Sequence, residues 1–331
     1  MSAVTGSVAR PDRVPRRRSD TGRDPDRPRR RVLVLGATGM LGHAVIRELA
    51  ETAELDVYGL ARSLDSREVL FPAHLLARII ASVDAGRFEQ VRQVLDELRP
   101  DVVVNCVGVI KQRPDVQDAV TTVTLNALLP HQLATACAQV GSRLIHVSTD
   151  CVFSGGRGGY VEQDLPDPPD LYGRSKLLGE TTTGPSLTLR TSIIGHELRS
   201  SRSLVDWFLS QRGRVRGYTR AIYSGVTTVE FARLLRTVVL PREELTGLFH
   251  VAAEPISKYE LLRLVAEVYG WQGELVAYDE FVCDRSMRAD ALATATGYRP
   301  PSWPEMIRAM HAARARWTGG QPRPDRHHIP A

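Results

Sequence analysis

A tyrosine and a lysine stand four residues apart in the stretch Tyr172-Gly-Arg-Ser-Lys176. In a helix, this spacing places both side chains on one face. A nearby ammonium group lowers the pKa of a phenol, so such a tyrosine can exchange a proton with a carbonyl or alcohol oxygen near neutral pH. The chain has three lysines and 40 arginines, which makes Lys176 a candidate for a role that a guanidinium cannot fill. We therefore predict Tyr172 and Lys176 as a catalytic pair.

A glycine-rich stretch, Gly36-Ala-Thr-Gly39-Met-Leu-Gly42, joins the apolar run of residues 31–35 to a helical pattern over residues 40–51. Glycines at such a place permit a tight turn, let the backbone approach a pyrophosphate, and let helix and strand pack closely. The helix start adds N–H groups and the positive end of its dipole. The spacing G-x-x-G-x-x-G, between a buried strand and a helix, predicts a dinucleotide site.

The choice of dinucleotide is read where the second apolar run, residues 55–60, ends. An acidic residue there would bind the ribose 2′-hydroxyl of NAD. This chain has Arg62 and Ser63 instead, which can hold the 2′-phosphate of NADP through charge-assisted hydrogen bonds. The sequence therefore favours NADP(H) over NAD(H). We expect Asp84, just after the third run, to accept from the adenine amino group.

Two further strand ends carry polar side chains for the same site. Ser148-Thr149-Asp150 ends one apolar run and can bring a hydroxyl to the oxygen that Tyr172 serves. Asn105-Cys-Val-Gly108 ends another, where the ribose on the nicotinamide side should pass, and Asn126 could polarise Lys176 through water. The predicted cofactor contacts are Gly36, Thr38, Gly39, Met40, Leu41, Gly42, Arg62, Ser63, Asp84, Cys106, Val107, Gly108, Tyr172 and Lys176.

The elements that must position these residues alternate between strands and helices. Apolar runs predict strands at residues 31–35, 55–60, 79–83, 100–105, 143–148 and 186–190, and periodic patterns predict helices at 40–51, 88–98, 116–140 and 171–184. This alternation is typical of an α/β Rossmann fold, a doubly wound parallel sheet. We expect that domain over residues 31–194. A smaller, mainly helical lobe for the substrate should follow over 195–318, with helices near 204–210, 228–239, 257–269 and 303–316.

The net charge of +5 comes from one end of the chain. Residues 1–31 hold ten arginines and four aspartates, which leaves the rest of the chain near neutral. A segment so poor in large apolar residues cannot offset its ordering entropy, so residues 1–30 are predicted to be a disordered basic tail. Residues 319–331 are predicted to be a second flexible tail. No interleaved aromatic residues accompany the arginines, so we expect no nucleic-acid partner.

The four cysteines form no C-x-x-C pair, and no apolar run is long enough to span a membrane or to form the core of a secretory signal. These features predict a cytoplasmic protein without a membrane partner. No His, Cys and Asp cluster has the spacing of metal ligands, so no catalytic metal is expected.

Taken together, these residues resemble the extended short-chain dehydrogenase/reductase family, and within it the dTDP-4-dehydrorhamnose reductases and related nucleotide-sugar reductases. The resemblance covers about residues 31–310. It is carried by the glycine-rich stretch and by Val147-Ser-Thr-Asp-Cys-Val-Phe153, Tyr160-x-Glu162-x-Asp164-x-Pro166, Tyr172-Gly-Arg-Ser-Lys-Leu-Leu-Gly-Glu180 and Leu189-Arg-Thr-Ser192. It implies a Thr149, Tyr172 and Lys176 triad that reduces a 4-keto sugar on a nucleoside diphosphate with NADPH. A homodimer is common in this family.

The substrate side departs from the pattern of the resemblance. Those reductases typically follow Arg-Thr-Ser with an aromatic residue that packs on the sugar, whereas this chain has Ile193. The identity of the sugar is therefore open. The predicted substrate contacts are Lys111, Asp150, Ser192, Arg202 and Arg220.

Two alternative functions remain. The first is a nucleotide-sugar epimerase of the same fold; a dehydratase is disfavoured because Thr149-Asp150 is followed by Cys151 and not by a second acid. The second is a non-catalytic, NADP-sensing regulatory protein. Such proteins often lose the tyrosine or the lysine, and this chain keeps both.

Overall fold

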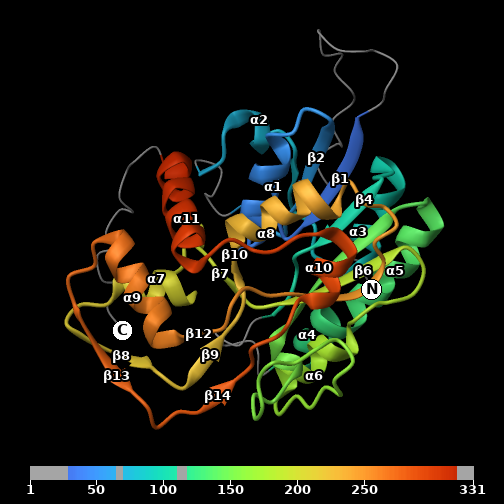
Figure 1. Cartoon of the computed structure of the whole chain (residues 1–331). Coiled ribbons are helices and arrows are strands. Elements are labelled where there is room, and N and C mark those ends of the chain that lie inside the picture. Colours follow the sequence, from blue (N-terminus) through green and yellow to red (C-terminus); the bar gives the residue numbers. More distant parts are fainter. Residues whose placement is uncertain (1–28, 65–69, 110–117, 319–331) are drawn as a thin grey trace, which may run out of the picture.

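The computed structural model describes residues 29–64, 70–109 and 118–318, and its centre is a seven-stranded parallel sheet (Figure 1). The strands are β1 (Arg30–Leu35), β2 (Leu55–Leu60), β3 (Ile79–Ile80), β4 (Val102–Asn105), β5 (Arg143–Thr149), β6 (Ser186–Thr191) and β11 (Gly247–Val251). Their order is β11-β6-β5-β4-β1-β2-β3. Successive strands are added outward on one side of β1 as far as β3 and then on its other side from β4 onward, so the strand order reverses between β1 and β4. Ligands of doubly wound sheets bind at this switch point, beyond the carboxyl ends of the strands. The predicted Rossmann fold is confirmed.

Helices cover both faces of the sheet because each central strand is apolar on both sides. In β1, Val32 and Val34 pack with α1 (Gly42–Ala50) and α8 (Thr228–Leu234), whereas Leu33 and Leu35 pack with α3 (Phe88–Leu98) and α5 (Leu129–Val140). This alternation follows from the two-residue period of a strand. The last helix, α11 (Trp303–Thr318), lies on the same face as α1 and α8.

The elements follow the predicted order, with three differences that have local causes. The third strand stops at Ile80 because Ser82 adopts a left-handed backbone with φ 63°. The predicted helix over 116–140 contains α4 (Ala119–Val123), a π-helical turn (Thr124–Leu128) and α5, which begins at Leu129 and has Pro130 in its first turn. Helix α6 (Leu171–Leu178) ends early, at Gly179, whose added Cβ would lie 2.0 Å from the Asn126 carbonyl oxygen.

A smaller lobe lies over one end of the sheet and mixes helices with short strands (Figure 1). Its helices are α7 (Leu204–Ser210) and α9 (Lys258–Tyr269), whereas α10 (Asp290–Thr296) packs against β11 of the central sheet. The side chain of Ser257 caps α9 by accepting from the Glu260 amide at 3.1 Å. Seven short strands complete the lobe: β7 (Ile193–Ile194), β8 (Arg214–Tyr218), β9 (Ala221–Tyr223), β10 (Val226–Thr227), β12 (Ile256–Ser257), β13 (Glu274–Tyr278) and β14 (Cys283–Asp284).

The sheet and the lobe share parts of the chain. Strand β11 comes from the second half of the sequence, yet it pairs in parallel with β6 and completes the sheet. A division at residue 194 stays a prediction, and the sheet draws its last strand from beyond it. The two predicted tails, residues 1–30 and 319–331, lie outside the described residues except for Arg29 and Arg30, the latter of which opens β1.

Candidate active site

The glycine-rich turn after β1 forms a tight corner that leaves no room for side chains. Gly36 has φ +76°, and a Cβ on it would lie 3.1 Å from the Cys106 carbonyl oxygen. A Cβ on Gly42, at the start of α1, would lie 2.1 Å from the carbonyl oxygen of Gly36. The amides of Gly36 and Ala37 anchor the corner by donating to the Leu60 carbonyl at 2.9 and 3.1 Å. The corner therefore presses the start of α1 against the end of β1.

This corner fits the phosphates of a dinucleotide. Within the described part of the chain, the N–H groups of Met40 and Leu41 donate to no other group, and they precede the first turn of α1. Free N–H groups at a helix start, together with its dipole, form a site for an anion. The structure thus offers a phosphate cradle at the switch point of the sheet.

The residues predicted for the adenosine end follow β2 and β3. Arg62 is exposed and Ser63 is half-buried, directly after the end of β2. Asp84 follows β3, and its carboxylate accepts from the Gly86 amide at 3.0 Å. These three residues lie on the far side of β1 from the catalytic candidates, which is where the adenine half of a dinucleotide should extend.

The stretch after β4 lies against the corner on its other side. The side chain of Asn105 accepts from the Val107 amide at 3.1 Å, which turns Cys106 and Val107 across the end of the sheet. Burial raises the pKa of the Cys106 thiol to about 12, so this side chain stays neutral. Gly108 follows, where an added Cβ would lie 3.1 Å from Asn126 Oδ1.

Asn126 links the loop after β4 to α6, and its predicted water-mediated action on Lys176 stays a prediction. Its Oδ1 accepts from the Val109 amide at 2.9 Å, and its Nδ2 donates to the Val109 carbonyl at 3.1 Å and to Ser175 Oγ at 3.2 Å. Its polar atoms are therefore engaged by the loop after β4 and by α6. Asn126 fixes the loop after β4 against the catalytic helix and does not contact Lys176 directly.

The three catalytic candidates converge at the end of β5. Lys176 is 4% exposed and donates from Nζ to the Val147 carbonyl at 2.7 Å. Tyr172, one turn earlier in α6, shares a hydrogen bond with the side chain of Thr149. Thr149 Oγ1 also lies 3.0 Å from Asp150 Oδ1, to which it can donate its proton. The structure thus brings Thr149, Asp150, Tyr172 and Lys176 together.

Burial sets the protonation of this group more strongly than the sequence suggests. Burial lowers the pKa of Lys176 to about 8, and Glu180 opposes that shift. Burial raises the pKa of Tyr172 above its ordinary value, with Cys151, Asp150 and Asp170 adding to the shift. The expected lowering of the tyrosine pKa is therefore absent from the free protein. Tyr172 is a neutral phenol at pH 7 and holds the proton that a general acid needs.

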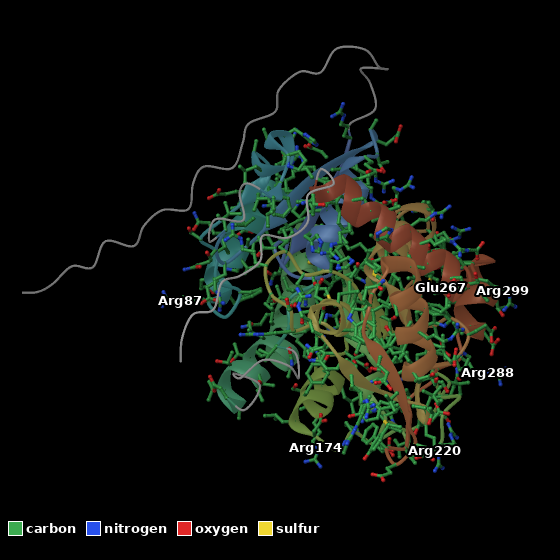
Figure 2. The ribbon with its side chains drawn as sticks, turned by 90° about the vertical axis from the view of Figure 1, so that its left-hand side faces the viewer. Arg87, Arg174, Arg220, Glu267, Arg288 and Arg299 are labelled. Carbon is green, nitrogen blue, oxygen red and sulfur yellow. The ribbon has the colours of Figure 1, made fainter. Side chains whose placement is uncertain are left out.

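The predicted substrate residues are spread out. Ser192 is half-buried directly before β7, and its side chain lies close to the hydroxyl of Tyr223. Arg220 is exposed and lies at the outer edge of the molecule (Figure 2). Arg202 is also exposed, while its backbone N–H donates to Glu197 at 2.7 Å. Lys111 lies outside the described residues.

Two side chains near Asp150 escaped prediction from the sequence. Arg285 donates to the carbonyls of Phe153 and Ser154 at 2.9 and 3.2 Å. The negative charge of Asp150 lies near enough to raise the pKa of Arg285. Tyr223 is 6% exposed, and burial together with the charge of Asp150 raises the pKa of its hydroxyl well above the ordinary value. One arginine among 40, and a tyrosine in a three-residue strand, give no signal in sequence.

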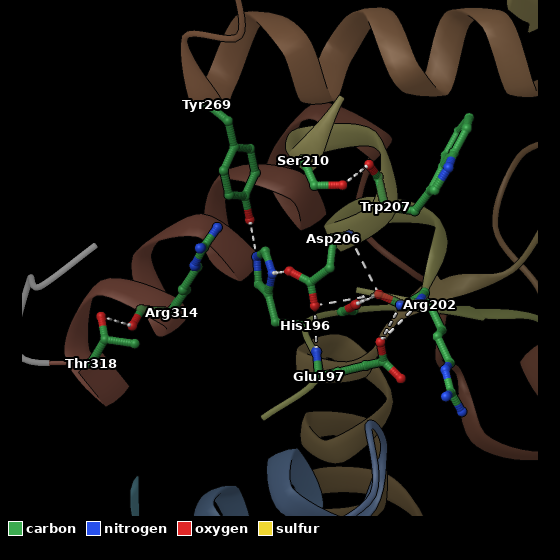
Figure 3. A network of polar contacts seen from close by, with 11 residues as sticks. His196, Glu197, Arg202, Asp206, Trp207, Ser210, Tyr269, Arg314 and Thr318 are labelled. Carbon is green, nitrogen blue, oxygen red and sulfur yellow. Dashed lines mark hydrogen bonds and ion pairs between the residues drawn. The ribbon is translucent and has the colours of Figure 1, made fainter. Parts of the chain in front are cut away.

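A buried polar network fixes the start of the lobe near α1, the helix that follows the glycine-rich corner (Figure 3). His196 bonds Asp206 through Nδ1 and the Tyr269 hydroxyl through Nε2, both at 2.7 Å. The second oxygen of Asp206 accepts from the Glu197 amide at 2.6 Å. Burial lowers the pKa of His43 in α1 to about 4. The charges of His196 and Asp206 also act on this pKa, which places His43 near the network. The loop after β7 is therefore held between α1 and α9.

Comparison with known proteins agrees with this geometry. The family model described as RmlD substrate binding domain matches residues 30–313. Methionine adenosyltransferase 2 subunit beta of Danio rerio is 32% identical over 256 residues, 73% of this chain and 75% of the relative. A probable low-salt glycan biosynthesis reductase of Haloferax volcanii is 31% identical over 262 residues, 73% of this chain and 81% of the relative.

A solved structure gives the same fold. The dTDP-4-dehydrorhamnose reductase of Bacillus anthracis, in complex with NADP, superposes with a TM-score of 0.71 at 24% identity, over 86% of this chain and 99% of that one. The resemblance predicted from the sequence is confirmed. The chain belongs to the RmlD substrate binding domain family, within the extended short-chain dehydrogenases/reductases.

Proposed function

We propose that the protein is an NADPH-dependent ketoreductase that acts on a 4-keto-deoxysugar carried on a nucleoside diphosphate. The observation that carries the proposal is the meeting of Thr149, Tyr172 and Lys176 at the end of β5, beside a phosphate cradle. The family match and the reductase relative support the substrate class. The four cysteines are free, which favours the reducing cytoplasm.

The chain supplies the proton chemistry of this reaction. Bound NADPH would supply a hydride to the carbonyl carbon of the sugar. Tyr172, neutral at pH 7, gives its proton to the carbonyl oxygen, so that the C=O group becomes CH–OH. Thr149 turns its hydroxyl from Asp150 to donate a second hydrogen bond to the same oxygen. The Lys176 ammonium would hold the ribose on the nicotinamide side of the cofactor. It also stabilises the tyrosinate that remains after Tyr172 gives up its proton.

A panel of 4-keto sugars linked to dTDP, UDP or GDP tests the proposal. We expect NADPH absorbance to fall with one nucleotide class, and the sugar to gain the mass of two hydrogens. Conversion of the sugar without net NADPH consumption would point to an epimerase. If no sugar reacts while NADP binds tightly, the proposal is wrong and a regulatory role is favoured. The similarity to methionine adenosyltransferase 2 subunit beta makes that second candidate specific.

The preference for NADPH should depend on Arg62. Replacing Arg62 with aspartate removes the cation for the 2′-phosphate and adds a repulsive charge. Since charge-assisted hydrogen bonds contribute about 1.5–3 kcal/mol, the ratio of kcat/KM for NADPH to that for NADH should fall at least about tenfold. Arg92→Asp, at an exposed site on α3, is the control and should leave the ratio unchanged. An unaltered ratio in Arg62→Asp would rule out this residue as the 2′-phosphate contact.

We propose a homodimer formed through α4 and α6. Val120 of α4, Leu128 of the π-helical turn that follows it and Leu178 of α6 are exposed to 77%, 50% and 64%, although all three are apolar and these elements are in contact. A two-fold axis through this face would let the same patch cover itself on a second copy.

No helix in the described part of the chain is both long and apolar enough to cross a membrane.

A charge placed in this patch should separate the dimer. Leu178→Glu is expected to raise the dissociation constant at least about 100-fold, because an unpaired carboxylate would be desolvated in the interface. Leu165→Glu, at a site that is 88% exposed in the loop before α6, is the matched control. Sedimentation velocity across a concentration series reports the outcome. Equal association of both variants would place the interface elsewhere.

A further inference from the structure

A buried ion pair between Arg190 and Glu180 lies just past the end of α6, the helix that carries Tyr172 and Lys176. Arg190 of β6 donates from Nε and Nη2 to the two carboxylate oxygens of Glu180 at 2.8 and 2.7 Å, and the two side chains are 4% and 7% exposed. Ser148 Oγ donates to the same carboxylate at 2.6 Å. Arg190 Nη1 also lies 3.4 Å from His250 Nε2. Residues from β5 and β6 thus hold one carboxylate in place, and His250 of β11 lies against the arginine.

The position of this carboxylate relates it to Lys176. Glu180 follows Lys176 by four residues, just past the end of α6. Lys176 bonds the carbonyl of Val147, and Glu180 bonds the hydroxyl of the next residue, Ser148. The ammonium and the carboxylate are therefore fixed to adjacent residues at the end of β5, the strand that also carries Thr149.

The groups around Lys176 leave Glu180 as the anion that acts on it. Burial keeps the Cys106 thiol neutral, and burial with the Lys176 charge holds the pKa of His146 well below its ordinary value. His250, beyond Arg190, also has its pKa lowered by burial. Tyr172 is a neutral phenol. Among the described residues named here, Glu180 is thus the anion that favours the ammonium form of Lys176, and Arg190 is the cation that pairs with Glu180.

A structural role alone does not explain this arrangement. Burying two charges costs about as much as their attraction returns, and apolar residues of similar size often stabilise a core equally well. We propose that Glu180 is a positioning residue of the active site, the fixed counter-charge that keeps Lys176 an ammonium ion, and that Arg190 limits its strength. This deepens the proposed function, since a charged Lys176 is what that mechanism requires.

The two members of the pair should act on Lys176 in opposite directions. Glu180→Gln keeps the shape and removes the anion, so the Arg190 charge is left uncompensated and the pKa of Lys176 should fall by about 1 unit or more. Arg190→Met leaves the Glu180 charge unshared, so the pKa of Lys176 should rise. A pair that only stabilises the fold would give no such opposition, because either change breaks the same contact.

The scarcity of lysine makes the titration measurable. With three lysines in the chain, ¹³C labelling of lysine gives three ε-methylene signals by NMR, and Lys111→Arg and Lys258→Arg assign them. In the full-length protein, the Lys176 signal should titrate near pH 8. Glu180→Gln should move the midpoint down, and Arg190→Met should move it up. Glu274→Gln, which breaks the exposed Arg214–Glu274 pair, is the control and should leave it in place.

The test stays decisive if Arg190→Met does not fold. The double variant Glu180→Gln/Arg190→Met removes both charges, and Lys176 should then titrate at higher pH than in Glu180→Gln alone. Equal midpoints in these two variants, or a Glu180→Gln midpoint that matches the unaltered protein, would overturn the proposal. The titration needs no substrate, so it separates this proposal from the proposed function. If no sugar is reduced, the function fails while the Lys176 titration still decides the role of Glu180.

Discussion

Tyr172→Phe should lower the turnover number by about 10²–10⁴-fold, the usual contribution of a general acid. The variant loses only the hydroxyl that shares a hydrogen bond with Thr149 and would donate to the carbonyl oxygen. The ring keeps its half-buried place on α6, so NADPH binding should change little. Steady-state oxidation of NADPH with the sugar identified from the panel measures the rate, and quenching of protein fluorescence measures binding.

A matched change elsewhere separates this effect from the loss of any buried hydroxyl. Tyr58 of β2 is also buried, and its hydroxyl donates to Asp56 at 3.0 Å, away from the strand ends. Tyr58→Phe should keep nearly full activity. If Tyr172→Phe turns over as fast as Tyr58→Phe, Tyr172 is not the acid and the mechanism must be abandoned.

Gly42→Ala should weaken NADPH binding by about 100-fold and destabilise the fold. The new Cβ would lie 2.1 Å from the Gly36 carbonyl oxygen and 2.7 Å from its carbonyl carbon, and both are backbone atoms that cannot rotate away. The start of α1 must therefore move from the corner, and a displacement of about 1 Å at a binding group can cost 10²-fold. Overpacking of this kind costs about 1–3 kcal/mol of stability.

The control for this change is a glycine with room for a methyl group. At Gly156 an added Cβ would lie 3.7 Å from Ser154 Oγ, an ordinary contact, so Gly156→Ala should bind NADPH normally. Thermal unfolding with and without NADPH reports both effects of Gly42→Ala. Normal stabilisation of that variant by NADPH would show that the corner does not hold the phosphates.

The sheet was predictable because its strands are buried on both faces. Val102, Val103 and Val104 form an apolar run that no other element explains as well, and the corner after β1 is signalled by three glycines. The lobe strands were not predictable for the opposite reason. β8 is buried only at Val215 and Gly217, so a single large apolar side chain between two arginines marks it in the sequence.

The site divides in the same way. Tyr172 and Lys176 are neighbours through a helix turn, so their spacing is visible in the sequence. Arg190 and His250 reach the site only because β6 and β11 are adjacent in the sheet, which no local pattern records. The raised pKa of Tyr172 has the same origin, since burial is a property of the packed molecule and not of the motif.

The late arrival of β11 has a consequence for how the protein can fold. Leu187 and Gly247 are paired in the sheet although 60 residues separate them, so the edge of β6 stays open until most of the chain has been synthesised. Parallel pairings over such distances are slow to form and leave an unpaired strand that invites association between chains. A fragment that ends at residue 194 should therefore aggregate rather than bind nucleotide alone, and the nucleotide half and the lobe should unfold as one cooperative unit.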